Sequence, residues 1–145
     1  MADRSPKPKD MGWLNPYIIV KDVKSSLEFY EKAFGFTTRM TLPDKEGNII
    51  HAEVQHKDSV IMMSPESEEM KTKSPISLGG SPASFYLYVD DVDKFFTRAK
   101  EAGAKVHTEP TDQFWGDRMC NLECPEGHRW TFATNVADFD PSKAP

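Results

Sequence analysis

The sequence contains one segment twice. The run Val20–Phe36 returns as the run Val89–Ala104, with Asp22 matched by Asp91 at a spacing of 69 positions. Each copy is typical of a strand end, an aspartate that caps a helix, an amphipathic helix and a glycine that ends it. The period of this repeat, 69 residues, is nearly half the length of the chain. It predicts two similar modules that face one another, with a binding site between them.

The length of the chain limits how these modules are organised. At 145 residues with 38% hydrophobic residues, the chain is long enough for one core and too short for two independent domains of ordinary size. We therefore predict one domain at 12–135. The other predicted segments are a flexible N-terminal arm (1–11), module one (12–64), a linker (65–83), module two (84–135) and a C-terminal tail (136–145).

Charge and hydropathy exclude several classes of protein. The net charge is −5, and no Lys/Arg cluster with interleaved aromatic residues occurs, so we expect no nucleic-acid partner. No apolar run approaches the ~20 residues that span a bilayer, and the N-terminus lacks the apolar stretch of a signal peptide. We therefore expect no membrane partner and a cytoplasmic location.

The two cysteines, Cys120 and Cys124, lie four positions apart in a predicted strand. At ~3.3 Å per residue their Cα atoms would be roughly 13 Å apart, beyond the ~7 Å limit for a disulfide. We predict buried free thiols. A zinc site that adds His128 has a spacing unlike that of common zinc knuckles.

Hydrophobic periodicity predicts the order βαβββ in each module. In module one, the helix begins after Asp22 and ends at Gly35. In module two, the helix begins after Asp91 and ends at Gly103. The predicted strands are 13–20, 36–42, 49–55 and 60–64 in module one, and 84–89, 105–111, 119–124 and 128–134 in module two.

This doubled order, with the Val20–Phe36 motif, resembles the vicinal oxygen chelate superfamily of glyoxalase I, bleomycin resistance proteins and extradiol dioxygenases. Four further motifs are similar to its PhnB-like branch: His51–Val54, Asp58–Met63, Phe114–Arg118 and Pro125–Trp130. The resemblance implies an α+β fold in which two βαβββ modules form a cupped, mostly antiparallel eight-stranded sheet. It also implies a homodimer.

In metal-using members of that superfamily, four strand positions supply His and Glu ligands. The flanking motifs place these positions on Asn15, Met62, Ser84 and Thr131. Neutral amide, hydroxyl and thioether groups offer a divalent ion no anionic charge. We therefore expect no metal cofactor. The alternative is a rearranged site around His51 and Glu53 that holds Zn, Ni, Mn or Fe.

Strand alternation predicts which side chains face the cup, because successive residues point to opposite faces of a sheet. Apolar sets such as Ile50, Ala52 and Val54 are expected to pack under the helices. The predicted cup-facing residues are Asn15, Tyr17, His51, Glu53, Met62, Ser84, Tyr86, Tyr88, Asn121, Glu123, Arg129 and Thr131. The candidate ligand-binding residues are His51, Glu53, Tyr86, Tyr88, Trp115, Arg118, Glu123 and Arg129.

Two of these groups have a second interpretation. Glu53 and Glu123 are predicted to be equivalent positions of the repeat. Each fits a role on the solvated surface or in a dimer contact as well as a role in a pocket. His51 suits a hydrogen-bonded pocket histidine better than a general base or metal ligand.

The loop of Trp115 also has two interpretations. Trp115 suits either a flap over a ligand or a cap on the core. Likewise, Asp117 and Arg118 suit either ligand contacts or a structural ion pair that fixes the loop.

These patterns favour a protein that binds a small organic molecule in its cup without a metal. Family members with drug-binding roles sequester cationic ligands, which gives Glu53, Glu123, Tyr86 and Trp115 a possible role. The second hypothesis is a divergent metal-dependent lyase, isomerase or dioxygenase. The third is a structural or regulatory dimer with no ligand.

Overall fold

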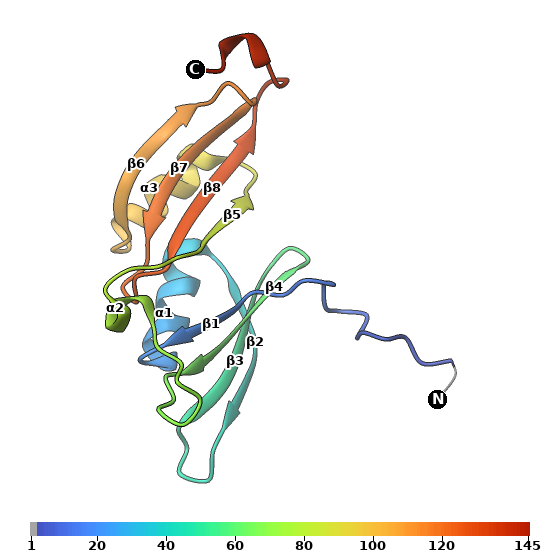
Figure 1. Ribbon diagram of the computed structural model, residues 1–145, viewed down its shortest axis with the longest axis vertical. Coiled ribbons are helices and arrows are strands. Elements are labelled where there is room, and N and C mark those ends of the chain that lie inside the picture. Colours follow the sequence, from blue (N-terminus) through green and yellow to red (C-terminus); the bar gives the residue numbers. More distant parts are fainter. Residues whose placement is uncertain (1–2) are drawn as a thin grey trace. The chain divides into compact units, whose positions relative to one another are not determined.

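The computed structural model describes residues 3–145, which form two compact units divided between Ser74 and Pro75. Each unit carries one βαβββ module, with its long helix on one face of its own sheet (Figure 1). The α+β class and the doubled βαβββ order are therefore confirmed. The strands form two four-stranded sheets, and the boundary between the units lies inside the predicted linker.

The first sheet has the strand order β1-β4-β3-β2. β1 pairs with β4 in parallel, and the other neighbours are antiparallel. The element bounds are β1 Tyr17–Val20, α1 Val23–Phe34, β2 Thr37–Pro43, β3 Ile49–His56 and β4 Ser59–Pro65.

The second sheet repeats this arrangement in the order β5-β8-β7-β6, with β5 parallel to β8. A short helix and a C-terminal 3₁₀ turn, η1, are added to the module. The bounds are α2 Pro75–Leu78, β5 Ser84–Tyr88, α3 Val92–Glu101, β6 Lys105–Asp112, β7 Asp117–Glu123, β8 Arg129–Asn135 and η1 Pro141–Lys143.

The helix boundaries follow the predicted capping residues. The Asp22 side chain accepts a hydrogen bond from the Ser25 backbone N–H, and Asp91 accepts one from the Lys94 N–H. These bonds satisfy amide groups that have no partner within the helix. Gly35 ends α1 in the left-handed conformation, at φ 66°, which glycine adopts without steric cost.

Each helix buries its apolar stripe against one face of its sheet. In the first unit, Tyr30 stacks on Phe36 at a ring-centroid distance of 5.8 Å. In the second unit, the ring centroids of Phe95 and Phe132 are 4.2 Å apart. Burial of each such side chain contributes roughly 1.5–3 kcal/mol to the stability of the fold. The helix therefore covers one face of its sheet, and the other face stays open.

Two local predictions were wrong. Ile50 was expected under the helix but is 44% exposed, because it lies near the outer end of β3, beyond the part of the strand that packs its side chains against the core. The first strand begins at Tyr17 instead of residue 13. Pro16, which has no N–H for a ladder bond, precedes it directly.

The strand registers show which positions of the repeat are equivalent. Tyr17 pairs with Met62, and Tyr86 pairs with Thr131. Each residue of the second pair lies 69 positions after its counterpart in the first pair. Opposite Met62 lies Glu53, whereas Asn121 lies opposite Thr131. The predicted match of Glu53 with Glu123 was therefore wrong. One extra residue in the second hairpin makes Asn121 the counterpart of Glu53, and Glu123 lies two positions further along the same face of β7.

Both cysteines are buried and free, as predicted. Burial raises the pKa of the Cys120 thiol to about 11, which keeps it protonated near neutral pH. The Cys124 sulfur lies 3.5 Å from His128 Nδ1. Within residues 3–145, no three His, Cys, Asp or Glu side chains gather closely enough to hold a metal ion.

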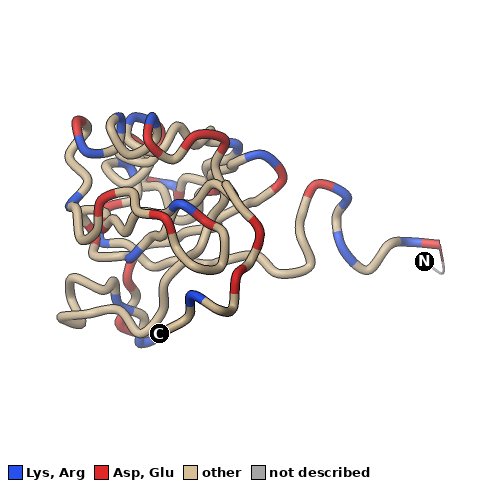
Figure 2. The backbone as a smooth tube through the Cα atoms, turned by 90° about the horizontal axis from the view of Figure 1, so that it is seen from above, with Lys and Arg blue, Asp and Glu red and all other residues tan. Residues whose placement is uncertain are grey.

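No helix in the described part of the chain combines the length and the apolar character needed to cross a bilayer. Lys and Arg residues are interspersed with Asp and Glu along the backbone of residues 3–145 (Figure 2).

Candidate functional site

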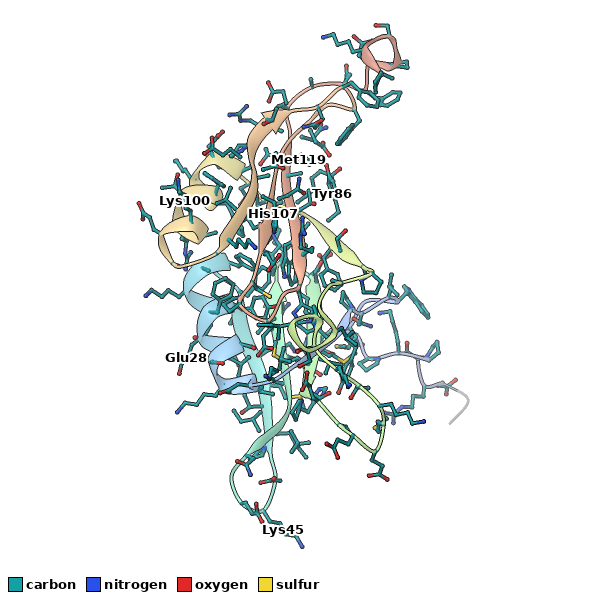
Figure 3. All side chains as sticks on the ribbon, turned by 60° about the vertical axis from the view of Figure 1, so that its left-hand side comes forward. Glu28, Lys45, Tyr86, Lys100, His107 and Met119 are labelled. Carbon is teal, nitrogen blue, oxygen red and sulfur yellow. The ribbon has the colours of Figure 1, made fainter. Side chains whose placement is uncertain are left out.

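The open face of the second sheet carries the densest group of predicted site residues. Tyr86 and Lys100 lie on opposite sides of this unit, Tyr86 on β5 and Lys100 on the helix side (Figure 3). Tyr86 is 46% exposed and Tyr88 is 55% exposed. They share a face because they are two residues apart in one strand, and their ring centroids are 5.6 Å apart.

Asp117 connects this aromatic group. The carboxylate is only 2% exposed. Tyr86 and Tyr88 both donate their hydroxyl hydrogens to its Oδ2, at 2.6 and 2.8 Å. The side chain of Asn135 donates to Oδ1 at 2.9 Å. The Trp115 indole N–H donates to the Tyr86 hydroxyl oxygen at 3.0 Å, so five side chains form one network.

Among the described residues, the side chains that donate hydrogen bonds to Asp117 are all neutral. Burial by itself raises the pKa of Asp117, but hydrogen bonds from Tyr86, Asn135 and Tyr88 outweigh it and set that pKa below its usual value. Conversely, burial and the bond to Asp117 raise the pKa of Tyr86 to about 12. The bond to Asp117 also raises the pKa of Tyr88. The site therefore holds a buried carboxylate and two phenols that resist ionisation.

Gly116 places Trp115 and Asp117 at the start of β7. Its φ is 100°, and a Cβ there would lie 2.2 Å from the carbonyl oxygen of Ala137. The backbone N–H groups of Val136 and Ala137 both donate to the Gly116 oxygen. Only glycine permits this close approach of the C-terminal segment.

A hollow of about 340 Å³ lies in the same unit, and Thr131 in its wall is the register partner of Tyr86 on β5. Its volume lies at the lower end of the range for small-molecule sites. Thr131 donates to the Asn121 side-chain oxygen at 2.6 Å. The lining residues are Ser81, Pro82, Ala83, Ser84, Asn121, Arg129, Trp130 and Thr131.

Arg118, a predicted ligand contact, lies on the opposite side of the sheet. Its Nε donates to both carboxylate oxygens of Asp93 in α3, at 3.0 and 3.2 Å, and its Nη1 donates to Asp112 at 3.1 Å. The proposed pair between Asp117 and Arg118 was wrong, because adjacent strand residues point to opposite faces. Arg118 therefore fixes α3 to the sheet.

Glu123 is the last residue of β7 and Arg129 is the first residue of β8, and the two are paired in the register of these strands. Glu123 Oε1 is 2.9 Å from His107 Nε2 and 3.9 Å from Arg129 Nη1. Arg129 also lines the hollow. Of this group, Arg129 is the residue that reaches the candidate site.

In the first unit, His51 and Glu53 share the open face of β3, as predicted. His51 Nε2 is 3.1 Å from Glu53 Oε2, and His51 Nδ1 is 3.2 Å from the Tyr17 hydroxyl. Arg39 Nε lies 3.3 Å from the other Glu53 oxygen and also pairs with Asp10. These five side chains form a second network centred on Glu53, which is 8% exposed.

The four positions that the resemblance matches to metal ligands carry neutral groups in this chain. The Asn15 side chain both accepts from and donates to the backbone of Gly12. Met62 offers a thioether, and the Thr131 hydroxyl hydrogen is donated to Asn121. None of these groups brings negative charge to offset dehydration of the ion. At His51 and Glu53, the Arg39 guanidinium opposes a second cation.

Sequence reasoning missed Arg39 and Asn135. Arg39 reaches Glu53 from a neighbouring strand through a register shift between Thr38 and Met40, which no local pattern reveals. Asn135 lies at the strand end, where alternation is a weak guide. The match of Tyr17 with Tyr86 was visible in the repeat and was the best available sign that both positions matter.

The sequence matches the family described as "Glyoxalase/Bleomycin resistance protein/Dioxygenase superfamily" over residues 11–132. An uncharacterized protein of Mycobacterium tuberculosis is 38% identical over 130 residues, which cover 88% of this chain and 76% of that protein.

Two solved structures share the fold. TioX from Micromonospora sp. ML1 has a TM-score of 0.70 at 25% identity, covering 86% of this chain and 99% of TioX. TnmS3, an antibiotic binding protein from Streptomyces sp. CB03234, has a TM-score of 0.61 at 22% identity, covering 85% of this chain and 96% of TnmS3. With a family match over most of its length and a relative at 38% identity, the chain belongs to the Glyoxalase/Bleomycin resistance protein/Dioxygenase superfamily.

Proposed function

We propose that this protein binds a small organic molecule on the open face of its second sheet, without the metal used by other members of the superfamily. The observation that carries this proposal is the group formed by Tyr86, Tyr88 and Trp115 around the buried carboxylate of Asp117, beside a hollow of about 340 Å³.

The aromatic side chains suit the recognition of a flat molecule. About half the surface of Tyr86 and of Tyr88 is exposed even though their hydroxyl groups are fixed by Asp117. Rings already held by hydrogen bonds lose little conformational entropy when a ligand stacks on them. Each stacked aromatic pair contributes about 0.5–1.5 kcal/mol beyond the area that it buries.

The charge of the site favours a ligand with a positive group. Asp117 accepts from three neutral side chains and contacts no Lys or Arg among the described residues. A cation over an electron-rich ring is attracted by the ring and by the carboxylate below it. TnmS3, which shares this fold, is an antibiotic binding protein, and that role supports an antibiotic-like ligand here.

The proposed absence of a metal rests on the chemistry of the available donors. Asn15, Met62, Ser84 and Thr131 offer no carboxylate or imidazole. Elemental analysis of protein purified without chelators tests this point. We expect less than stoichiometric Zn, Ni, Mn and Fe. One equivalent of any of them would contradict the metal-free account.

We also assign the chain to the PhnB-like branch and expect a homodimer. The branch is supported by the motifs around His51, Asp58, Trp115 and Gly127, and the homodimer follows from that assignment. Sedimentation at micromolar concentration distinguishes a dimer from a monomer.

A fluorescence titration tests ligand binding. The protein with Trp13→Phe keeps Trp115 beside the tyrosines and Trp130, which is largely buried but also lines the hollow. The probes are bleomycin and three acridines of matched shape, namely N-methylacridinium, acridine and acridine-9-carboxylate. We expect the cationic acridine to quench most strongly, at the lowest concentration.

Two variants separate the contribution of the Trp115 indole from that of the Asp117 carboxylate. Trp115→Phe should abolish most of the quenching, and Asp117→Asn should remove most of the preference for the cation while keeping the shape of the site. Binding of none of the four probes, or quenching that is undiminished in Trp115→Phe, would contradict the proposal.

A further inference from the structure

The chemistry of the Tyr17 network fixes the direction of its hydrogen bonds. Glu53, paired with Arg39, is an acceptor only, so His51 Nε2 must carry the hydrogen of their 3.1 Å contact. In neutral His51 the other nitrogen, Nδ1, then holds a lone pair. The Tyr17 hydroxyl must donate to that lone pair across 3.2 Å.

This order places a base behind an accessible hydroxyl. Tyr17 is 50% exposed, whereas the side chains of His51 and Glu53 are 21% and 10% exposed. A hydroxyl in contact with a base, which is itself oriented by a carboxylate, is the arrangement that activates nucleophiles in unrelated enzymes. Such general-base assistance accelerates reactions by about 10²–10⁴-fold.

We propose that Tyr17, His51 and Glu53 form a reactive site in which the Tyr17 oxygen attacks small activated acyl compounds such as aryl esters. The Tyr17 oxygen forms a bond to the acyl carbon, and the bond from that carbon to the leaving oxygen breaks. The hydroxyl proton moves to His51 Nδ1 and from there to the departing aryl oxide or to water. The product is an ester on Tyr17.

Glu53 acts through His51 and is a positioning residue. Its carboxylate selects the tautomer with hydrogen on Nε2 and stabilises the imidazolium formed during the step. This site goes beyond the proposed binding function, because it lies entirely in the first unit and uses none of the residues around Asp117.

The experiment treats the full chain with p-nitrophenyl acetate at pH 8 and maps acetylated tyrosines by mass spectrometry of tryptic peptides. Tyr88 is the internal control. It is 55% exposed, so access is matched, but its hydroxyl bonds to a carboxylate that is already ionised. We expect acetylation of Tyr17 to be at least about tenfold faster than that of Tyr88, from the general-base contribution.

Two variants test the relay. His51→Gln keeps a polar partner beside Tyr17 but removes the base, and it should lower the Tyr17 rate to that of Tyr88. Glu53→Gln should turn its amide N–H toward His51 Nε2, move the ring hydrogen to Nδ1 and lower the rate equally. The ¹⁵N shifts of His51 report this change of tautomer, which a merely structural role of Glu53 would not produce.

Circular dichroism and thermal unfolding confirm that each variant is folded before its rate is compared. Equal acetylation of Tyr17 and Tyr88 in the unaltered protein would overturn the proposal. So would an unchanged Tyr17 rate in folded His51→Gln.

Discussion

Tyr17 and Tyr86 occupy the same position of the two repeats but have opposite partners. Both lie on the strand parallel to the last strand of their module, opposite Met62 and Thr131. The Tyr17 hydroxyl contacts an imidazole nitrogen, whereas the Tyr86 hydroxyl donates to a buried carboxylate. One scaffold position therefore supports a phenol beside a base in one unit and a phenol held protonated in the other.

The difference shows how a duplicated fold can carry two different hydrogen-bond networks at equivalent positions. In the second unit, burial and the hydrogen bond to Asp117 raise the pKa of Tyr86, and that bond fixes its ring, which suits a rigid binding surface. In the first unit, the charge of Glu53 is balanced by Arg39, and the network ends at an accessible hydroxyl. Function is set by these side chains, because the backbone arrangement is shared.

The largest expected effect comes from breaking the second network at its backbone. Gly116→Ala places a Cβ against the Ala137 carbonyl at a positive φ, and we expect a loss of about 2–4 kcal/mol in the free energy of unfolding. Chemical denaturation measures it. Gly80→Ala is the matched control, because a Cβ there meets nothing within 4 Å.

Ligand binding should fall with Gly116→Ala, while acetylation of Tyr17 should be retained in protein that remains folded. Loss of both functions in a folded Gly116→Ala variant would show that the two networks are not separate.

A smaller effect is expected at high pH. The pKa of Tyr86 is raised in the folded protein to about 12, from an unfolded value of about 10. The folded state therefore holds this proton more tightly than the unfolded state does. The stability that the raised pKa of Tyr86 contributes is complete below about pH 10 and is lost as the pH rises toward about 12.

Denaturation midpoints measured across this pH range should fall less steeply for Tyr86→Phe than for the unaltered protein. The effect is modest because Tyr86 is half exposed. Identical slopes would contradict the assigned role of Asp117 in holding the Tyr86 proton.

The smallest effect on function is expected at Arg118. Its guanidinium contacts Asp93 and Asp112 on the helix side of the sheet. Arg118→Ala should therefore lower the melting temperature slightly and leave the affinity for the cationic acridine unchanged. A clear loss of affinity without unfolding would show that Arg118 belongs to the binding face after all.

The fold was largely predictable because its signals are local and occur twice. Asp22 and Asp91 as caps, glycines after the helices and strand alternation determined the element order. The partners of the site residues were less predictable. Asp117 and Arg118 are neighbours in sequence that point to opposite faces, and the contact from Arg39 to Glu53 depends on a register shift.

The most direct test of the central comparison is the ratio of acetylation at Tyr17 to acetylation at Tyr86, measured in one sample of the full chain. We predict a ratio of at least about ten that falls to near one in His51→Gln. A ratio near one in the unaltered protein would contradict the claim that the two matched tyrosines have diverged in chemistry.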